Sequence, residues 1–153
     1  MRHLLVILIA FYSAFTFAQE TIEHEPVANK AEYYVSSFNP RKDIDDLMDW
    51  AADFEAWQNE SGLYDSMSTS LLVPYFISDT SQHDLVWLNI WPSSTEQYAG
   101  LDNWLNNGGK LLSKLPVTNS QVVDTWQWAI SEPEGESSIG MVRYSDCKMK
   151  EGV

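Results

Sequence analysis

Cysteine is nearly absent from this 153-residue sequence, and basic residues are scarce. Cys147 is the only cysteine, which excludes an intrachain disulfide, and it has no partner histidine motif that would predict a thiol nucleophile. Nine Lys and Arg residues stand against 22 Asp and Glu residues, for a formal charge of −13. Because so acidic a surface repels phosphate backbones and anionic lipid headgroups, we expect neither nucleic-acid binding nor peripheral membrane binding.

The sequence also lacks the motifs of common catalytic and metal sites. It has no Gly-rich phosphate loop and no serine-hydrolase elbow, and Gly108-Gly109 is typical of a helix end. His24 and His83 lack the neighbours that would complete a set of three or four metal ligands. We therefore expect no metal and no cofactor. Three aspartates at four-residue steps predict a solvated ridge on a helix, in place of a calcium-binding loop: Asp45, Asp49 and Asp53.

The N-terminus has the pattern of a signal peptide. Arg2 gives a positive start, an uncharged apolar run follows, and Thr16 and Ala18 supply the small residues before a cleavage site. The run is shorter than the roughly 20 residues that span a bilayer. We expect residues 1–18 to be removed, residues 19–31 to form a polar linker, and the mature chain to have no membrane segment. The expected location is periplasmic or secreted, and the lack of disulfides favours a bacterial periplasm.

Hydrophobic periodicity predicts two helices among four strands. The expected strands are at residues 33–38, 69–77, 85–91 and 121–131, and the expected helices are at 43–58 and from Ser93 or Ser94 to Gly108. The apolar stripe of the first helix is Ile44, Leu47, Met48, Ala51, Phe54 and Trp57, and that of the second is Tyr98, Leu101, Trp104 and Leu105. A turn is expected at 110–115. The β-α-β-β-α-β order predicts an α+β, ferredoxin-like sandwich over residues 32–131, with a four-stranded antiparallel sheet and both helices on one face.

The element order, the element lengths and the Trp-rich strands of residues 32–131 resemble those of the dimeric α+β barrel superfamily. In that superfamily two such units pair to close a barrel. The resemblance therefore implies a homodimer.

The end of the chain looks like a further strand. Residues 141–148 resemble the first expected strand when Tyr144 is set against Tyr34. Two interpretations stay open. Either residues 139–153 begin a truncated second copy of the domain after a linker at 132–138, or the similarity is a matter of chance.

The candidate binding site is the sheet face away from the helices. The aliphatic side chains of the third strand (Val86, Leu88 and Ile90) are expected beneath the helices, so the alternate side chains face outward. Rings combined with a few amides and hydroxyls are typical of a small-molecule pocket, and equally of a dimer core. The expected ligand-binding residues are Trp87, Asn89, Trp91, Phe76 and Ser70.

These observations favour an exported binding module for a small apolar or aromatic ligand. One alternative is an enzyme like the cofactor-independent monooxygenases of the barrel superfamily, with Trp87, Asn89 and His83 around the substrate. A second alternative is a structural domain whose aromatic face serves only for self-association. An enclosed cavity with His83 turned inward would favour the enzyme.

Overall fold

The computed structural model describes residues 27–75, 83–129, 140–145, 147–148 and 150. The expected signal peptide at 1–18, the linker at 132–138 and Phe76 lie outside the described residues. Among the residues that the structure describes, no helix is both long and apolar enough to cross a membrane.

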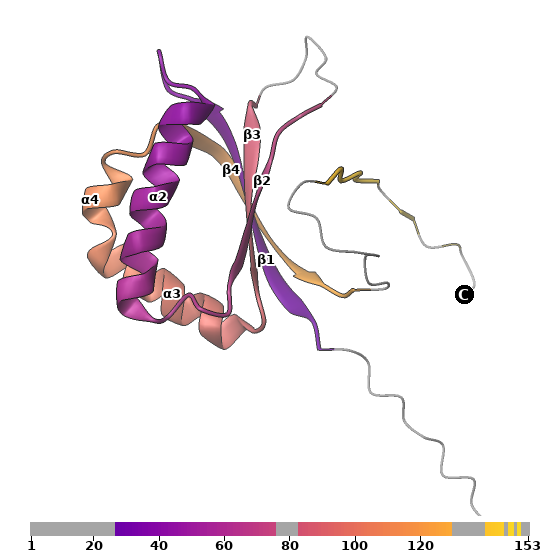
Figure 1. Cartoon of the computed structure of the whole chain (residues 1–153). Coiled ribbons are helices and arrows are strands. Elements are labelled where there is room, and N and C mark those ends of the chain that lie inside the picture. The colour runs from indigo at the N-terminus through magenta and orange to yellow at the C-terminus, as the bar shows by residue number, and fades with distance from the viewer. Residues whose placement is uncertain (1–26, 76–82, 130–139, 146, 149, 151–153) are drawn as a thin grey trace, which may run out of the picture.

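The fold is α+β and is built on one four-stranded antiparallel sheet. The strands are β1 (Asn29–Phe38), β2 (Ser68–Leu72), β3 (Leu85–Trp91) and β4 (Val117–Gln127), and the helices are α2 (Ile44–Ser61), α3 (Ser94–Asn107) and α4 (Gly109–Leu112). The strand order is β2-β3-β1-β4, which places β3 and β1 in the centre. Figure 1 shows the helices on one face of the sheet and the end of the chain on the other side. The predicted α+β class and antiparallel sheet are confirmed, and the short helix α4 takes the first half of the turn expected at 110–115.

Helix α2 starts and ends on capping residues. The Asp43 side chain accepts hydrogen bonds from the backbone of Asp45 and Asp46, and the Asp46 carboxylate accepts one from the backbone of Asp43. This reciprocal arrangement is a capping box. Gly62 ends the helix with a φ of 64°, a left-handed conformation in which glycine has no steric penalty.

The buried stripe of α2 is turned relative to the predicted one. Leu47 and Trp50 are its buried residues, whereas Met48, which was expected inside, is 55% exposed. Trp50 can lie in the core because its Nε1 donates a hydrogen bond to the backbone oxygen of Leu111 at 2.9 Å. The predicted acidic ridge is exposed to solvent: Asp45, Asp49 and Asp53.

The buried stripe of α3 is also turned relative to the predicted one. Its buried residues are Gln97 and Gly100, whereas Leu105, a member of the predicted stripe, is 81% exposed. A Cβ on Gly100 would lie only 2.3 Å from the Trp91 ring. The helix therefore packs on the sheet through a position that has no side chain. Periodicity of apolar residues did not reveal this contact, because neither Gln97 nor Gly100 counts as apolar in the pattern.

Strand β1 is longer than predicted, because it pairs on both sides from its first residues. Lys30 lies opposite Trp91 of β3 and Trp126 of β4, so the strand begins at Asn29 and not at Tyr33. Strand β4 starts at Val117, opposite Phe38, which is also earlier than expected. Strand β2 is at the edge of the sheet and ends at Leu72, before Pro74, which lies within the expected strand 69–77 but cannot donate a ladder hydrogen bond.

The expected orientation of β3 was wrong. Trp87, Asn89 and Trp91 lie on the face that the helices cover, and Val86, Leu88 and Ile90 lie on the open face. Trp87 packs against Trp50 of α2 at 5.9 Å between ring centroids, and Leu85 belongs to the core cluster with Leu47, Trp50 and Val117. Because side chains alternate along a strand, these contacts fix the faces of all seven residues of β3. The large rings fill the layer between the sheet and the helices.

The described residues at the end of the chain, 140–145, 147–148 and 150, form no strand or helix. Tyr144 packs edge-on against Tyr33 of the open face, with ring centroids 6.0 Å apart. Burial, followed by the neighbouring Tyr33, raises the pKa of Tyr144 to about 12. This segment therefore contacts the sheet face opposite the helices. The interpretation of a truncated second copy stays a prediction.

Candidate functional site

A cavity of about 110 Å³ lies between the helix-covered face of the sheet and the helices. Its walls are mainly aromatic, and the rings come from the sheet, from α2 and α3, and from the loop after α2. The aromatic lining residues are Tyr34, Trp50, Phe54, Tyr64, Trp87, Trp91 and Trp104. We call these seven residues the aromatic wall.

The rings around Trp50 lie either nearly parallel or nearly perpendicular to it. Trp50 and Phe54 are stacked, with 16° between their planes. Trp87 and Trp104 stand at 79° and 86° to Trp50. Because the rings pack edge to face, the wall presents both ring faces and ring edges.

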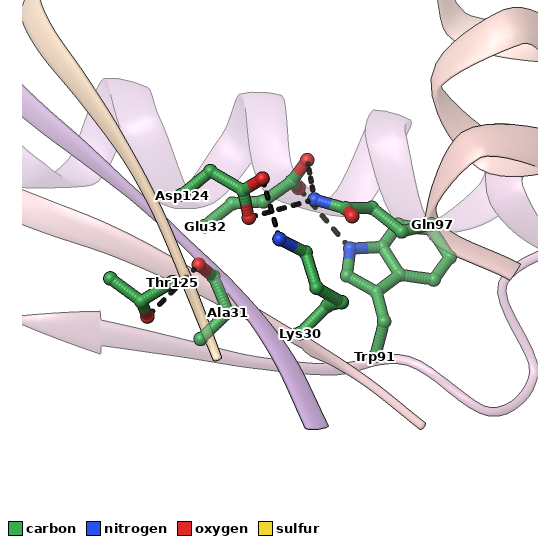
Figure 2. Close-up of polar contacts among 7 residues, drawn as sticks. All are labelled: Lys30, Ala31, Glu32, Trp91, Gln97, Asp124 and Thr125. Atoms are coloured by element: carbon green, nitrogen blue, oxygen red, sulfur yellow. Dashed lines mark hydrogen bonds and ion pairs between the residues drawn. The ribbon is translucent and has the colours of Figure 1, made fainter. Parts of the chain in front are cut away.

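The cavity also has one strongly polar wall, where Glu32 of β1 is only 4% exposed. Its two carboxylate oxygens accept hydrogen bonds from Trp91 Nε1 at 3.2 Å and from Gln97 Nε2 at 2.9 Å. The sheet register places Glu32 between Asn89 of β3 and Asp124 of β4. Figure 2 shows the Gln97 amide nitrogen between the Glu32 and Asp124 carboxylates.

The Gln97 amide nitrogen bridges the two carboxylates, whereas its carbonyl oxygen is left without a hydrogen bond among the described residues. Its Nε2 also donates to Asp124 Oδ1 at 3.2 Å, and its buried Oε1 has no hydrogen-bond partner among the described residues. The amide orientation follows from the chemistry, because only the NH₂ group can donate to carboxylates. A buried polar atom without a partner costs about 1–3 kcal/mol, so the bridge is a net gain only if the two carboxylates need the donor.

The two carboxylates differ in charge balance. Asp124 forms an ion pair with Lys30, whose Nζ lies 2.6 Å from Asp124 Oδ2 and 4.6 Å from the centre of the Trp126 ring. Within the described part of the chain, no Lys, Arg or His lies within ion-pair distance of Glu32. Glu32 is therefore a buried carboxylate held by neutral donors alone.

Tyr34 adds a neutral hydroxyl beside Glu32. Burial, the negative charge of Glu32, a hydrogen bond to Glu32 and the charge of Asp124 all raise the pKa of Tyr34. The phenol therefore stays protonated at neutral pH and adds no second negative charge to the cavity wall.

The indole N–H of Trp87, which can donate but not accept a hydrogen bond, fixes the orientation of the Asn89 amide. Its Oδ1 accepts hydrogen bonds from Trp87 Nε1 at 2.8 Å and from Thr69 Oγ1 at 2.9 Å. Because an indole N–H only donates, the Asn89 oxygen must face Trp87. The Asn89 NH₂ group is then a fixed donor on a residue that lines the cavity.

The structure brings together three of the five predicted ligand-binding residues. Trp87, Asn89 and Trp91 line the cavity, on the face opposite to the one expected. Ser70 is exposed on the other face, where it pairs with Leu88, and Phe76 is outside the described residues.

The predicted ligand-binding set lacked polar residues of the site and five of the seven rings of the aromatic wall. Glu32 and Gln97 were overlooked because charged and amide side chains are usually exposed, and Trp50 because the predicted stripe was turned. The spacing of Trp50 three residues after Leu47 was the signal that could have found it.

His83, the expected base of the enzyme hypothesis, lies elsewhere. It lines a second cavity of about 370 Å³ on the open face, together with Leu72, Val86, Met141 and Tyr144. Among the described residues, no group of three or more His, Cys, Asp or Glu side chains could hold a metal ion.

No protein-family model matches this chain, and no curated protein matches it in sequence.

Proposed function

We propose that this chain is an exported binding module that holds a small apolar or aromatic ligand in the cavity between the sheet and the helices. The observation that carries the proposal is the aromatic wall around a cavity of about 110 Å³. An apolar cavity of roughly 150 Å³ in another protein takes up benzene, so the space suits a ligand part of about one small ring. Convergent rings with a few oriented polar groups are the usual make-up of a ligand site.

Binding is favoured over catalysis because of where the candidate base lies. His83 lines the cavity on the open face, so it cannot act on a ligand among the rings of the aromatic wall. Asn89 and Glu32 are both held by hydrogen bonds that orient them, which suits recognition.

The ferredoxin-like arrangement and the homodimer belong to this proposal. The β-α-β-β-α-β order, with β1 between β3 and β4, supports the first. The resemblance to the dimeric α+β barrel superfamily supports the second, through the open face of the sheet. Sedimentation velocity tests the homodimer, and the intact mass of the exported protein tests cleavage after Ala18.

A fluorescence titration with toluene tests the binding site. Trp87→Ala should weaken toluene binding by about 30-fold, the effect of losing roughly 2 kcal/mol at an aromatic hot spot. Trp128→Ala is the matched control, because Trp128 is 50% exposed and does not line the cavity. Equal toluene affinity of the two variants would refute the proposed site.

A further inference from the structure

The cavity holds a negative charge that forms no ion pair among the residues that the structure describes. Glu32 is the one charged residue among the described residues that line it. The nearest ion pair engages Lys30 with Asp124, and the Gln97 amide bridges Asp124 and Glu32. A buried carboxylate without a cation is costly, and a strongly desolvated charge at a cavity wall marks a candidate site of recognition.

The Glu32 carboxylate retains capacity to accept a further hydrogen bond. A carboxylate offers about four acceptor positions. Trp91 and Gln97 each occupy one, and the neutral Tyr34 hydroxyl lies beside the carboxylate. All three groups are neutral, so the negative charge remains available to a ligand.

The aromatic wall complements the same kind of ligand. Ring faces attract cations electrostatically, most strongly the faces of tryptophan, and cages of such rings recognise methylated ammonium groups. The rings of Trp87 and Trp104 each stand nearly perpendicular to that of Trp50. The net charge of −13 would also raise the local concentration of cations around the protein.

We infer that the cavity is an aromatic cage for a small organic ammonium ion, with the charged head among the rings and beside Glu32. This inference rests on the proposed function, because it assumes that the cavity binds a ligand, and it adds the charge of that ligand. An anionic ligand is disfavoured by Glu32. A volume of about 110 Å³ limits the enclosed part to a compact head group.

The test compares choline with 3,3-dimethylbutan-1-ol, its neutral carbon isostere, by isothermal titration calorimetry on the folded protein. The two probes have the same shape, so their difference in affinity measures the preference for positive charge. We expect choline to bind at least about tenfold more tightly, in the range that cation–π contacts and one carboxylate support. Equal or tighter binding of the alcohol would overturn the cage but leave the proposed function standing. Failure of both choline and the alcohol, together with failure of toluene, would overturn both.

The variant Glu32→Gln tests whether the preference for the cation depends on the Glu32 carboxylate. It keeps the shape of the side chain but removes its charge, and it replaces one of the two acceptor oxygens by an NH₂ donor. Choline affinity should fall towards that of the alcohol, whereas alcohol affinity should stay within about twofold. Asp53→Asn is the matched control, because Asp53 is an exposed carboxylate on α2 that does not line the cavity. An unchanged choline preference in Glu32→Gln, or an equal loss in Asp53→Asn, would contradict the role of Glu32. If Glu32→Gln fails to fold, the comparison of choline with its isostere on the parent protein still decides.

Discussion

The two faces of the sheet are built from different kinds of side chain. On the helix-covered face, β3 presents Trp87, Asn89 and Trp91, and β1 presents the buried Glu32. On the open face, β3 presents only aliphatic side chains (Val86, Leu88 and Ile90). Wide rings with polar edges span the gap to the helices and line the first cavity, whereas aliphatic side chains, among them Val86, line the second cavity on the open face. The aromatic layer on the helix-covered face is therefore internal, and hydrogen bonds fix its polar edges.

The largest expected effect is a difference in the free energy of unfolding between substitutions at two neighbouring residues of β3 that point to opposite faces. Leu85→Ala removes a core side chain that is 1% exposed, and should lower the free energy of unfolding by about 3 kcal/mol. Val86→Ala, on the partly exposed open face, should lower it by about 1 kcal/mol. Urea denaturation of both variants measures the difference. A larger loss from Val86→Ala would show that the two faces have been interchanged.

An intermediate effect is expected where α3 meets the sheet. Gly100→Ala should destabilise by about 1–3 kcal/mol, because the new methyl group overlaps the Trp91 ring. Gly109→Ala is the control, since a Cβ there meets no atom within 4 Å. In an unconstrained helix, Gly→Ala stabilises by about 1 kcal/mol, so the two variants should shift the melting temperature in opposite directions. A rise in melting temperature for Gly100→Ala would mean that α3 does not lie against Trp91.

The smallest effect concerns the chain end on the open face. The pKa of Tyr144 is raised to about 12 by its packing, above an unfolded value near 10. The contact is therefore fully formed below about pH 10 and is lost as the pH rises through about 12. Tyr144→Phe should remove the phenolate step near pH 12 from an ultraviolet absorbance titration. Loss of a step near pH 10 would instead show that Tyr144 is free in solution.

Most of the helices and strands could be predicted from the sequence, whereas their orientation could not. Asp43 and Gly62 mark the ends of α2 through cap chemistry that is local in sequence. The orientation of β3 depends on which of two apolar sets faces the helices, and alternation is identical for both. The decision lies in tertiary packing, since only the large rings fill the space around Trp50.

Of the residues that line the candidate cavity, three belong to the predicted ligand-binding set. Trp87, Asn89 and Trp91 were recognised as rings around an amide, and they do line a cavity. Glu32 was not recognised, because carboxylates are usually exposed to solvent. Its burial in β1 depends on hydrogen bonds from Trp91 and Gln97, which are distant in sequence.

The most direct test of the central claim is a set of intermolecular nuclear Overhauser effects between toluene and the protein. The claim is that the ligand lies between the sheet and the helices. It predicts contacts from toluene protons to the indole protons of Trp50, Trp87 and Trp104, which line the cavity. Contacts from toluene to the methyl groups of Leu72, Val86 and Leu88, without contacts to those indoles, would place the ligand on the open face and contradict the account.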